Sequence, residues 1–201
     1  MEGISSMPTE KEKMLAGKLY DPSTKELVEL RTKAHSLCAK FNATSETDEK
    51  LREEILKDLL GELGSEACIQ GPIQLDYGCF TYIGDRTFIN FNLTVLDTCP
   101  VHIGKDVFIG PNVSILTPLH PMKWQERNCY HKEDGTLTDA EYGAPITIED
   151  NCWIAGNVTI CAGVTIGMGS VIGAGSVVTR DIPAGHFAAG NPCRVVRGIG
   201  E

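Results

Sequence analysis

The chain has 201 residues, 42% of them hydrophobic, and a formal net charge of −9. This length suffices for one domain with a small additional segment. The negative charge argues against a nucleic acid or an anionic membrane as the partner of the whole surface. No apolar run approaches the roughly 20 residues of a membrane-spanning helix, and the N-terminus lacks the apolar core of a signal peptide. None of the eight cysteines forms a C-x-x-C pair, so we expect no zinc or redox motif, and reduced thiols in the cytoplasm.

Residues 1–64 are predicted to form an N-terminal helical segment. Apolar residues recur at helical spacing in two stripes, one from Leu27 to Phe41 and one from Leu51 to Leu63. Gly61 and Gly64 lie at the end of the second stripe and favour termination of its helix. We interpret both stripes as packing surfaces without chemistry of their own.

Residues 65–201 are predicted to form a second unit, and isoleucine or valine recurs at every sixth residue through most of it. One series runs from Ile148 to Val178, and two phased series cover residues 83–115. A period of six fits neither a helix nor a plain strand. It predicts a mostly β fold, a triangular solenoid with one face per hexapeptide and three hexapeptides per coil.

Residues 117–145 interrupt this period with a polar segment that contains Trp124, Tyr130 and Tyr142. Long excursions from a compact domain are often functional. Setting the segment aside leaves about 95 residues, enough for roughly five coils. The pattern fades through Gly190-Asn191-Pro192, which we interpret as a C-terminal cap.

Several motifs give the chain a close resemblance to the maltose and galactoside O-acetyltransferases of the hexapeptide-repeat superfamily. They occur along nearly the whole sequence: Ala16-Gly17-Lys18-Leu19-Tyr20, Asp76-Tyr77-Gly78, Asn90-Phe91-Asn92, His120-Pro121, Glu141-Tyr142-Gly143, Asn151-Cys152-Trp153-Ile154 and Gly190-Asn191-Pro192-Cys193-Arg194-Val195. The resemblance implies a left-handed parallel β-helix, transfer of acetyl from acetyl-CoA to a sugar hydroxyl, and a homotrimer with intersubunit active sites. No metal is implied.

His120 is the expected catalytic base. It stands where the regular coil gives way to the excursion, and Pro121 restricts its backbone to extended conformations. An imidazole exchanges its proton near neutral pH, which suits a base that activates a hydroxyl. The family's catalytic histidine aligns with His120, and the family works by direct transfer without an acyl-enzyme.

The resemblance also assigns residues to the acceptor. Asn90 aligns with a position that contacts both substrate and the acetyl end of acetyl-CoA; a corner asparagine is the alternative. The expected sugar contacts are Asp21 (or Pro22), Asp76, Asp97 (or Thr98) and Glu141. Phe88 and Asp76 replace the Tyr and Ser of galactoside-type members, which favours the maltose-type branch that acetylates maltose and glucose.

The cofactor side is expected in the C-terminal coils. Trp153, Ala155, Gly156 and Ala174 align with the pantetheine slot, where small residues let a thin ligand approach backbone amides. Thr179, Arg180, Arg194 and Arg197 give a basic end to an acidic chain, which suits the phosphates of CoA.

Two readings from other classes stay open. His102 and His120 are 18 residues apart, one coil, as in the zinc carbonic anhydrases built on the same solenoid, but a third histidine at suitable spacing is missing. A catalytically idle trimeric scaffold is the other. The excursion also looks longer than in bacterial members near residues 129–138, which leaves the acceptor open.

Overall fold

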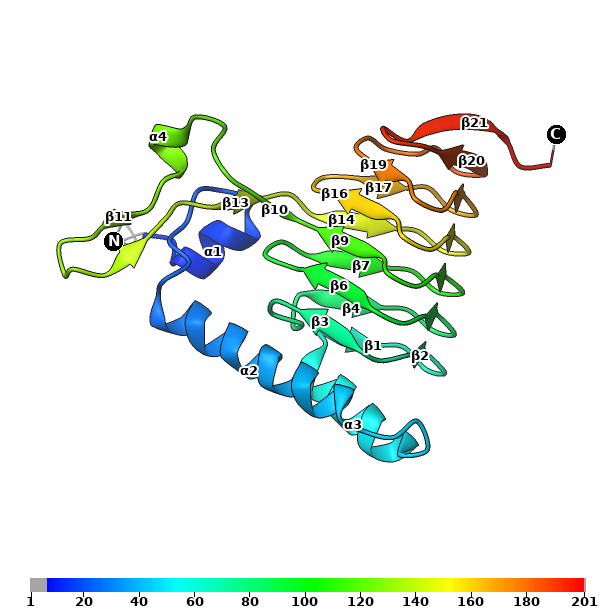
Figure 1. Ribbon diagram of the computed structural model, residues 1–201, viewed down its shortest axis with the longest axis horizontal. Coiled ribbons are helices and arrows are strands. Elements are labelled where there is room, and N and C mark those ends of the chain that lie inside the picture. The colour runs from blue at the N-terminus through cyan, green and yellow to red at the C-terminus, as the bar shows by residue number, and fades with distance from the viewer. Residues whose placement is uncertain (1–6, 201) are drawn as a thin grey trace, which may run out of the picture.

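The computed structural model describes residues 7–200, which form a left-handed parallel β-solenoid with helices below it and an arm at one side (Figure 1). The chain begins with the short helix α1 (Glu10–Leu15). Its N-terminus is closed by a capping box, in which Glu12 N donates to Thr9 Oγ1 (3.1 Å) and Thr9 N donates to Glu12 Oε2 (2.7 Å).

Two further helices, α2 (Lys25–Asn42) and α3 (Glu49–Leu59), cover the lower end of the solenoid. The α2 stripe is buried as expected at Leu27, Ala34, Leu37, Cys38 and Phe41. The Asn42 side chain donates to Ile73 O (2.9 Å) and accepts from Ile73 N (2.8 Å). Helix α2 therefore covers the edge of the lowest coil, where backbone groups would otherwise remain unpaired.

The solenoid starts slightly earlier than the expected boundary at residue 65. Helix α3 ends at Leu59, and Leu63 already lies in a strand, paired with Ile83 of the next coil. The helical segment therefore ends before residue 64, and residues 62–63 pair with the first face of the solenoid instead.

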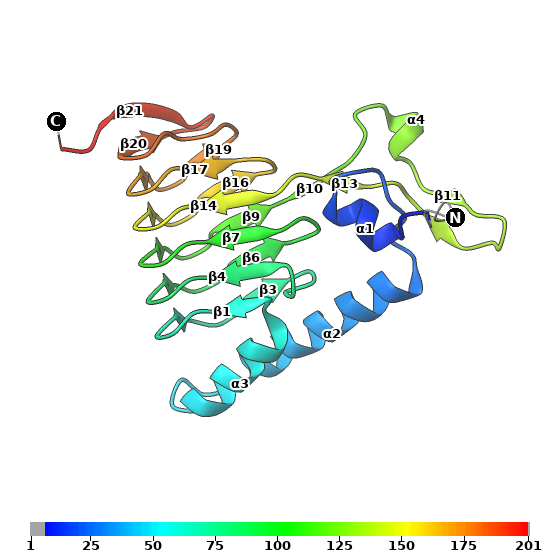
Figure 2. The ribbon, with the colours of Figure 1, turned by 180° about the vertical axis from the view of Figure 1, so that it is seen from behind.

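The strands stack into three sheets, one on each face of the solenoid, and within each sheet the strands from successive coils run parallel (Figures 1 and 2). The first face contains β1 (Glu62–Leu63), β4 (Thr81–Ile83), β7 (Val101–Ile103), β14 (Ile146–Ile148) and β17 (Thr165–Ile166). The second contains β2 (Cys68–Ile69), β5 (Phe88–Ile89), β8 (Phe108–Ile109), β15 (Trp153–Ile154), β18 (Val171–Ile172), β20 (His186–Ala189) and the antiparallel β21 (Arg194–Gly198). The third contains β3 (Ile73–Leu75), β6 (Leu93–Leu96), β9 (Ser114–Leu116), β16 (Thr159–Cys161) and β19 (Val177–Val178). Five complete coils and part of a sixth result.

The hexapeptide anchors form the core, as the period predicts. The residues from Ile148 to Val178 at six-residue spacing are all fully buried, and so are those of the other series to within a few per cent. The glycine that follows several anchors has a steric cause, because a Cβ on Gly84 would lie 2.6 Å from Gly104 C in the next coil. Backbone from adjacent coils thus approaches too closely there for a side chain.

The coils differ in length, and this explains why the sequence contains two phased series. In the lower coils, strand partners are 20 residues apart, as in Leu63 with Ile83, whereas in the upper coils they are 18 apart, as in Ile148 with Ile166. The two extra residues fall between the third and first faces, the same corner from which residues 117–145 leave. We call this corner the arm edge, and residues 117–145 the arm.

The arm is more structured than a polar loop. It contains β10 (Pro118–Leu119), the short helix α4 (Trp124–Arg127), β11 (Tyr130–His131), β12 (Leu137–Thr138) and β13 (Tyr142–Gly143). β10 pairs with β13, and β11 with β12, both antiparallel. The arm projects beside α1, on the side of the solenoid opposite the second face (Figures 1 and 2).

Across residues 7–200, none of the helices combines the length and the apolar character that crossing a membrane requires.

Candidate active site

His120 lies at the base of the arm, directly after β10. Antiparallel pairing of Leu119 with Tyr142 brings the two ends of the arm together. His120, at the start of the arm, therefore lies beside Asp139 and Glu141 near its end. The imidazole is 43% exposed, and its Nδ1 lies 3.6 Å from Asp139 Oδ2. This separation is within the range of an ion pair and longer than a hydrogen bond.

A second carboxylate, that of Glu141, lies next to this pair. One ligand atom each from His120, Asp139 and Glu141 fall within 4.8 Å of one another. Tyr20 donates its hydroxyl to Glu141 Oε2 (2.7 Å), and the two residues also form an antiparallel backbone bridge. Burial, followed by the Glu141 contact, raises the pKa of Tyr20, which therefore remains a protonated donor.

Asp21 lies on the N-terminal segment against the hairpin of the arm. Its Oδ1 accepts from Thr138 Oγ1 and from the amide (2.9 Å) and hydroxyl (2.6 Å) of Ser23, and its Oδ2 accepts from Lys132 Nζ (2.9 Å). Burial alone would raise the pKa of Asp21, but the hydrogen bonds from Ser23, Thr138 and Lys132 outweigh it and hold the pKa well below its usual range. Asp21 therefore fastens the arm to the N-terminal segment.

Asp76 lies on the arm edge, directly after β3, and faces helix α2. His35 Nε2 lies 3.6 Å from its Oδ1, and Arg31 Nη1 donates to the neighbouring Tyr77 hydroxyl (3.1 Å). Burial raises the pKa of Asp76, although Arg31 and His35 act in the opposite direction. Burial likewise raises the pKa of Tyr77 to about 12.

Asp97 is a correction to the sequence expectation of a sugar contact. Its side chain is fully buried, with Oδ1 accepting from Tyr77 N (2.8 Å) and Oδ2 from Thr81 Oγ1 (2.9 Å). The alternative, Thr98, is 1% exposed. Neither residue presents a polar group to solvent: Asp97 accepts from Tyr77 N and Thr81, and the Thr98 hydroxyl is hydrogen-bonded to that of Thr117 (3.1 Å).

Asn90 lies on a different edge, between the second and third faces. We call it the asparagine edge, because Asn92, Asn112 and Asn157 form a ladder of side-chain hydrogen bonds there (2.9 and 3.1 Å). These three asparagines adopt the left-handed backbone conformation of the corner, with φ near +60°. Asn90 does not belong to this group, and its Oδ1 accepts a hydrogen bond from Phe91 N (2.7 Å). The left-handed corner position is therefore occupied by Asn92 and not by Asn90.

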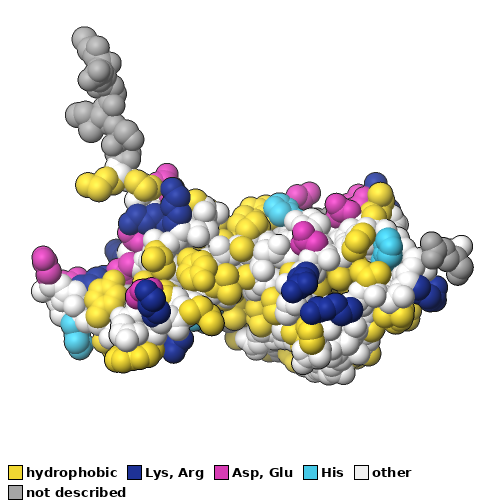
Figure 3. Space-filling view, turned by 90° about the horizontal axis from the view of Figure 1, so that it is seen from above, with side chains coloured by type: hydrophobic (Ala, Val, Ile, Leu, Met, Phe, Trp, Pro, Cys, Tyr) yellow, Lys and Arg dark blue, Asp and Glu magenta, His cyan; other side chains and the backbone are white. Residues whose placement is uncertain are grey.

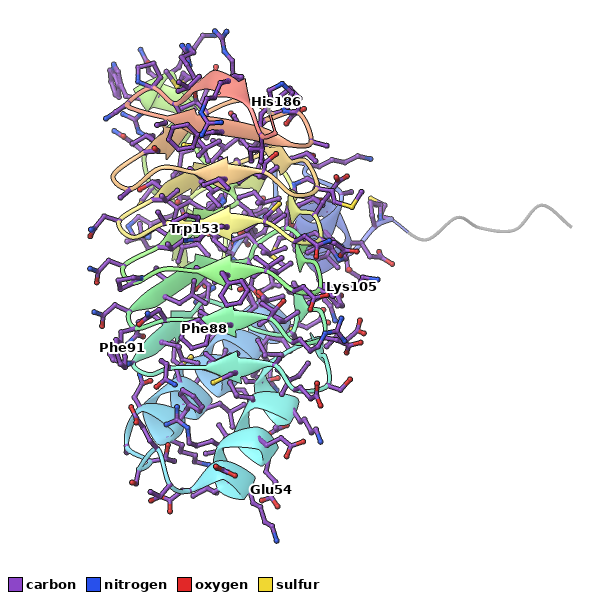
Figure 4. The ribbon with its side chains drawn as sticks, turned by 90° about the vertical axis from the view of Figure 1, so that its right-hand side faces the viewer. Glu54, Phe88, Phe91, Lys105, Trp153 and His186 are labelled. Carbon is purple, nitrogen blue, oxygen red and sulfur yellow. The ribbon has the colours of Figure 1, made fainter. Side chains whose placement is uncertain are left out.

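The small residues expected at the pantetheine slot lie on the same edge as Asn90. Gly110 N donates to Ile154 O and Ala155 N to Ile172 O, so these corner positions stack from coil to coil above Asn90, and Gly175 N donates to Gly156 O (3.0 Å). Trp153 is exposed on the second face, on the same column as Phe88 (Figure 4).

The basic residues divide between the two edges. Arg194 and Arg197 lie on β21, where they pair with Ala189 and Phe187 of the second face, and Arg197 lies over the Phe187 ring (5.9 Å from its centroid). Thr179 and Arg180 instead follow β19, on the arm edge. Lys and Arg side chains are visible on this end of the solenoid from above (Figure 3).

The expected site residues therefore form two groups at opposite edges of the third face. The arm edge holds His120, Glu141, Asp21, Asp76 and Arg180, and the asparagine edge holds Asn90 and the small residues, with Arg194 beside it. Sequence reasoning missed Asp139, Lys132, Tyr20, His35 and Arg31. Tyr20 lies inside a matched motif, but nothing in the pattern marks the other four.

The histidine pair that suggested a zinc site lies on separate elements. His102 is on β7, with its ring stacked on Tyr82 (4.7 Å between centroids). Among residues 7–200, the group of His, Cys, Asp and Glu side chains close enough to share an ion consists of His120, Asp139 and Glu141, without His102.

Comparison with known proteins agrees with this architecture. Residues 13–64 match the maltose acetyltransferase hexapeptide capping motif, and residues 145–180 match the bacterial transferase hexapeptide (six repeats). Galactoside O-acetyltransferase of Escherichia coli K12 is 40% identical over 190 residues, covering 94% of this chain and 89% of the relative.

Solved structures are similar over the same length. A maltose O-acetyltransferase from Clostridium difficile 630 superposes with a TM-score of 0.89 at 44% identity, covering 96% of this chain and 99% of the other. A galactoside acetyltransferase in complex with coenzyme A gives a TM-score of 0.88 at 39% identity, covering 97% and 92%. The chain therefore belongs to the hexapeptide-repeat O-acetyltransferase family of the maltose and galactoside enzymes.

Proposed function

We propose that this acetyl-CoA-dependent O-acetyltransferase transfers acetyl to a hydroxyl of a maltose- or glucose-like sugar, with His120 as general base. The observation that carries the proposal is the arm edge, where an exposed imidazole lies beside carboxylates. A galactoside or another small hydroxyl compound is the alternative acceptor.

The chemistry needs a single proton transfer before the thioester breaks. His120 takes the proton of the acceptor hydroxyl as its oxygen attacks the acetyl carbonyl carbon, and a tetrahedral oxyanion forms. Collapse of this intermediate releases the CoA thiolate, which takes up the proton from His120. A base of this kind is typically worth about 10²–10⁴ in rate.

The arm edge offers the groups that a sugar requires. Asp76 and Tyr77 lie on one side, with His35 and Arg31 from α2 beside them, and Glu141 lies next to His120. Carboxylates accept hydrogen bonds from sugar hydroxyls, and an arginine donates to them. We retain Asp76 and Glu141 as proposed sugar contacts, whereas the carboxylate of Asp21 is already engaged by the arm.

Acetyl-CoA is proposed to lie along the asparagine edge, against Asn90, Trp153, Ala155, Gly156 and Ala174. A structural neighbour from Vibrio cholerae, 37% identical, is described as complexed with acetyl coenzyme A. Arg194 and Arg197 supply cations near one end of this edge, and Thr179 and Arg180 lie on the other edge of the third face.

A homotrimer would reconcile the two separated groups. His120 and Asn90 lie at opposite edges of the third face, so one chain alone does not bring the base to the small-residue edge. Packing the solenoids side by side would place the arm edge of one subunit against the asparagine edge of the next. The exposed Phe108 and Trp153 of the second face give such an interface apolar area to bury. We infer a cytoplasmic location from the eight cysteines, which are all free thiols.

The test is free-thiol release from acetyl-CoA, measured with maltose, glucose and a β-galactoside as acceptors. His120→Ala is expected to lower turnover by at least about 10² while sparing acetyl-CoA binding, because a base acts mainly in the transition state. His131→Ala is the matched control, since this histidine lies on the arm hairpin and directs Nδ1 to Gly135 O.

Acceptor-dependent release that His120→Ala abolishes and His131→Ala keeps would support the proposal and rank the sugars. Unchanged turnover in His120→Ala would remove this residue from the mechanism. Release with none of the three sugars, despite acetyl-CoA binding, would overturn the proposed acceptor class.

A further inference from the structure

We propose that Asp139 is the positioning residue of His120, and that Lys132 holds Asp139 in place through Asp21 and Thr138. This inference rests on the proposed role of His120 as base. It assigns a function to two residues of the arm for which the sequence analysis predicted none.

Asp139 faces the Nδ1 side of the His120 imidazole. The nearer ring nitrogen is Nδ1, 3.6 Å from Asp139 Oδ2. A neutral imidazole has one N–H and one lone pair, and a carboxylate can only accept. Asp139 therefore favours the tautomer with the proton on Nδ1, which leaves the Nε2 lone pair to take the acceptor's proton. Such contacts are often long in an unliganded site and shorten when substrate binds.

Asp139 is better placed than Glu141 to orient the imidazole of His120. Glu141 is tied to the N-terminal segment through its Oε2, which receives the Tyr20 hydroxyl (2.7 Å), and through backbone bonds to the same residue (2.9 and 3.3 Å). Glu141 therefore has one carboxylate oxygen engaged by Tyr20, although its carboxylate also lies within 4.8 Å of the His120 and Asp139 ligand atoms. Asp139 lies two residues earlier; its side chain is 25% exposed, and its Oδ2 lies 3.6 Å from His120 Nδ1.

Asp139 is held in place by hydrogen bonds from neighbouring residues of the arm to Asp21. The preceding residue, Thr138, is 5% exposed and donates its hydroxyl to Asp21. The strand partner of β12 carries the chain into Lys132, whose ammonium donates to Asp21 Oδ2 and to Ser23 Oγ (both 2.9 Å). Both strands of the hairpin are thus fixed to one carboxylate, and the residue after Thr138 is placed beside the base.

The expected consequence is a graded loss of turnover. Asp139→Asn keeps the shape of the side chain but offers an amide N–H that stabilises the opposite tautomer, so turnover should fall by about 10–10² with little change in the KM for acetyl-CoA. Lys132→Met should lower turnover by a smaller factor, and Lys132→Arg should restore it. Asp134→Asn, in the hairpin turn where Asp134 accepts from Thr136 N (2.8 Å), is the matched control and should behave as wild type.

A purely structural role is separated from this one by ¹⁵N NMR of the His120 ring in the full-length protein. In wild type the proton should lie on Nδ1, and in Asp139→Asn the population should move to Nε2. An unchanged tautomer together with unchanged turnover in Asp139→Asn would overturn the inference. So would a loss of turnover that also appears in Asp134→Asn, since it would reflect the hairpin rather than the base.

The inference and the proposed function fail in different ways. If His120→Ala abolishes acetyl transfer and Asp139→Asn leaves it untouched, His120 stands as base and the positioning role of Asp139 is wrong. If His120→Ala is fully active, the proposed base and its positioning residue are both wrong.

Discussion

The solenoid coils and the arm hold their shapes by different means. In the coils, every sixth side chain is buried in a continuous stack, and neighbouring coils approach so closely that glycine is required at positions such as Gly84. In the arm, most side chains from Met122 to Leu137 are exposed, and the position is fixed by a few polar contacts to Asp21 and Tyr20. The repetitive part is a rigid support, whereas the irregular part carries the proposed base.

The largest expected difference between the two regions is in the cost of removing an apolar side chain. Ile115→Ala, at a fully buried position of β9, should lower the free energy of unfolding by about 2–5 kcal/mol, because it leaves a cavity in the stack. Leu137→Ala, at a position on the arm hairpin that is 56% exposed, should cost less than about 0.5 kcal/mol. Urea denaturation of both variants measures this; equal losses would mean that the arm has a core of its own.

The second expected effect concerns the corner where the coils gain their extra residues. Asp97→Ala should lower the free energy of unfolding by about 1–3 kcal/mol, because Tyr77 N–H and the Thr81 hydroxyl lose a buried acceptor. Asp97→Asn keeps an amide oxygen and should cost less. Burial raises the pKa of Asp97, whereas the hydrogen bonds from Tyr77 and Thr81 act in the opposite direction.

Acetyl transfer assays on the same two variants distinguish a structural from a sugar-binding role. A stable Asp97→Ala protein with a raised KM for the acceptor would contradict the structural assignment and return Asp97 to the sugar site.

The smallest effect is the pH dependence of the arm's attachment. The pKa of Asp21 is lowered in the folded chain, so its contribution to stability is present above the unfolded value of about 3.9 and is lost as the pH falls below it. The wild-type advantage over Asp21→Asn in the free energy of unfolding should be about 1–2 kcal/mol at pH 7 and pH 5, and should shrink near pH 3.

Denaturation of both proteins at the three pH values measures this advantage. Glu46→Gln, at an exposed position between α2 and α3, is the control and should show no such trend. A difference that disappears already between pH 7 and 5 would show that some other group controls the attachment.

Much of the fold could be predicted because a solenoid is encoded locally. The anchors from Ile83 to Val178 mark each face in turn, and the break at residue 117 marks the arm. The first solenoid strand, at Glu62–Leu63, begins a few residues before the expected boundary at residue 65, and glycines near a helix end resemble glycines near a coil corner. The secondary structure of the arm was missed because its strands are two residues each and carry no periodic pattern.

The candidate site was predictable only where a residue type and a local context coincide. His120 followed from its place before Pro121 and from the resemblance. Asp97 was misassigned, because a carboxylate that satisfies buried donors and one that meets a sugar have the same sequence signature. Lys132 and Asp139 were not predicted, because their proposed roles depend on contacts with residues distant in the sequence. Lys132 contacts Asp21, and Asp139 lies beside His120.

The amino-acid sequence by itself determined the solenoid, the number of its coils, the family and the histidine at the base of the arm, because the spacing of buried anchors and short motifs is a local property. Only the tertiary structure decided which residues share an edge. It placed His120 with Asp139 and Asp76 on the arm edge, set Asn90 apart on the asparagine edge, and buried Asp97 at the arm edge itself. These placements depend on how many residues each corner holds and on contacts between segments as far apart as Asp21 and Lys132, which no local pattern records.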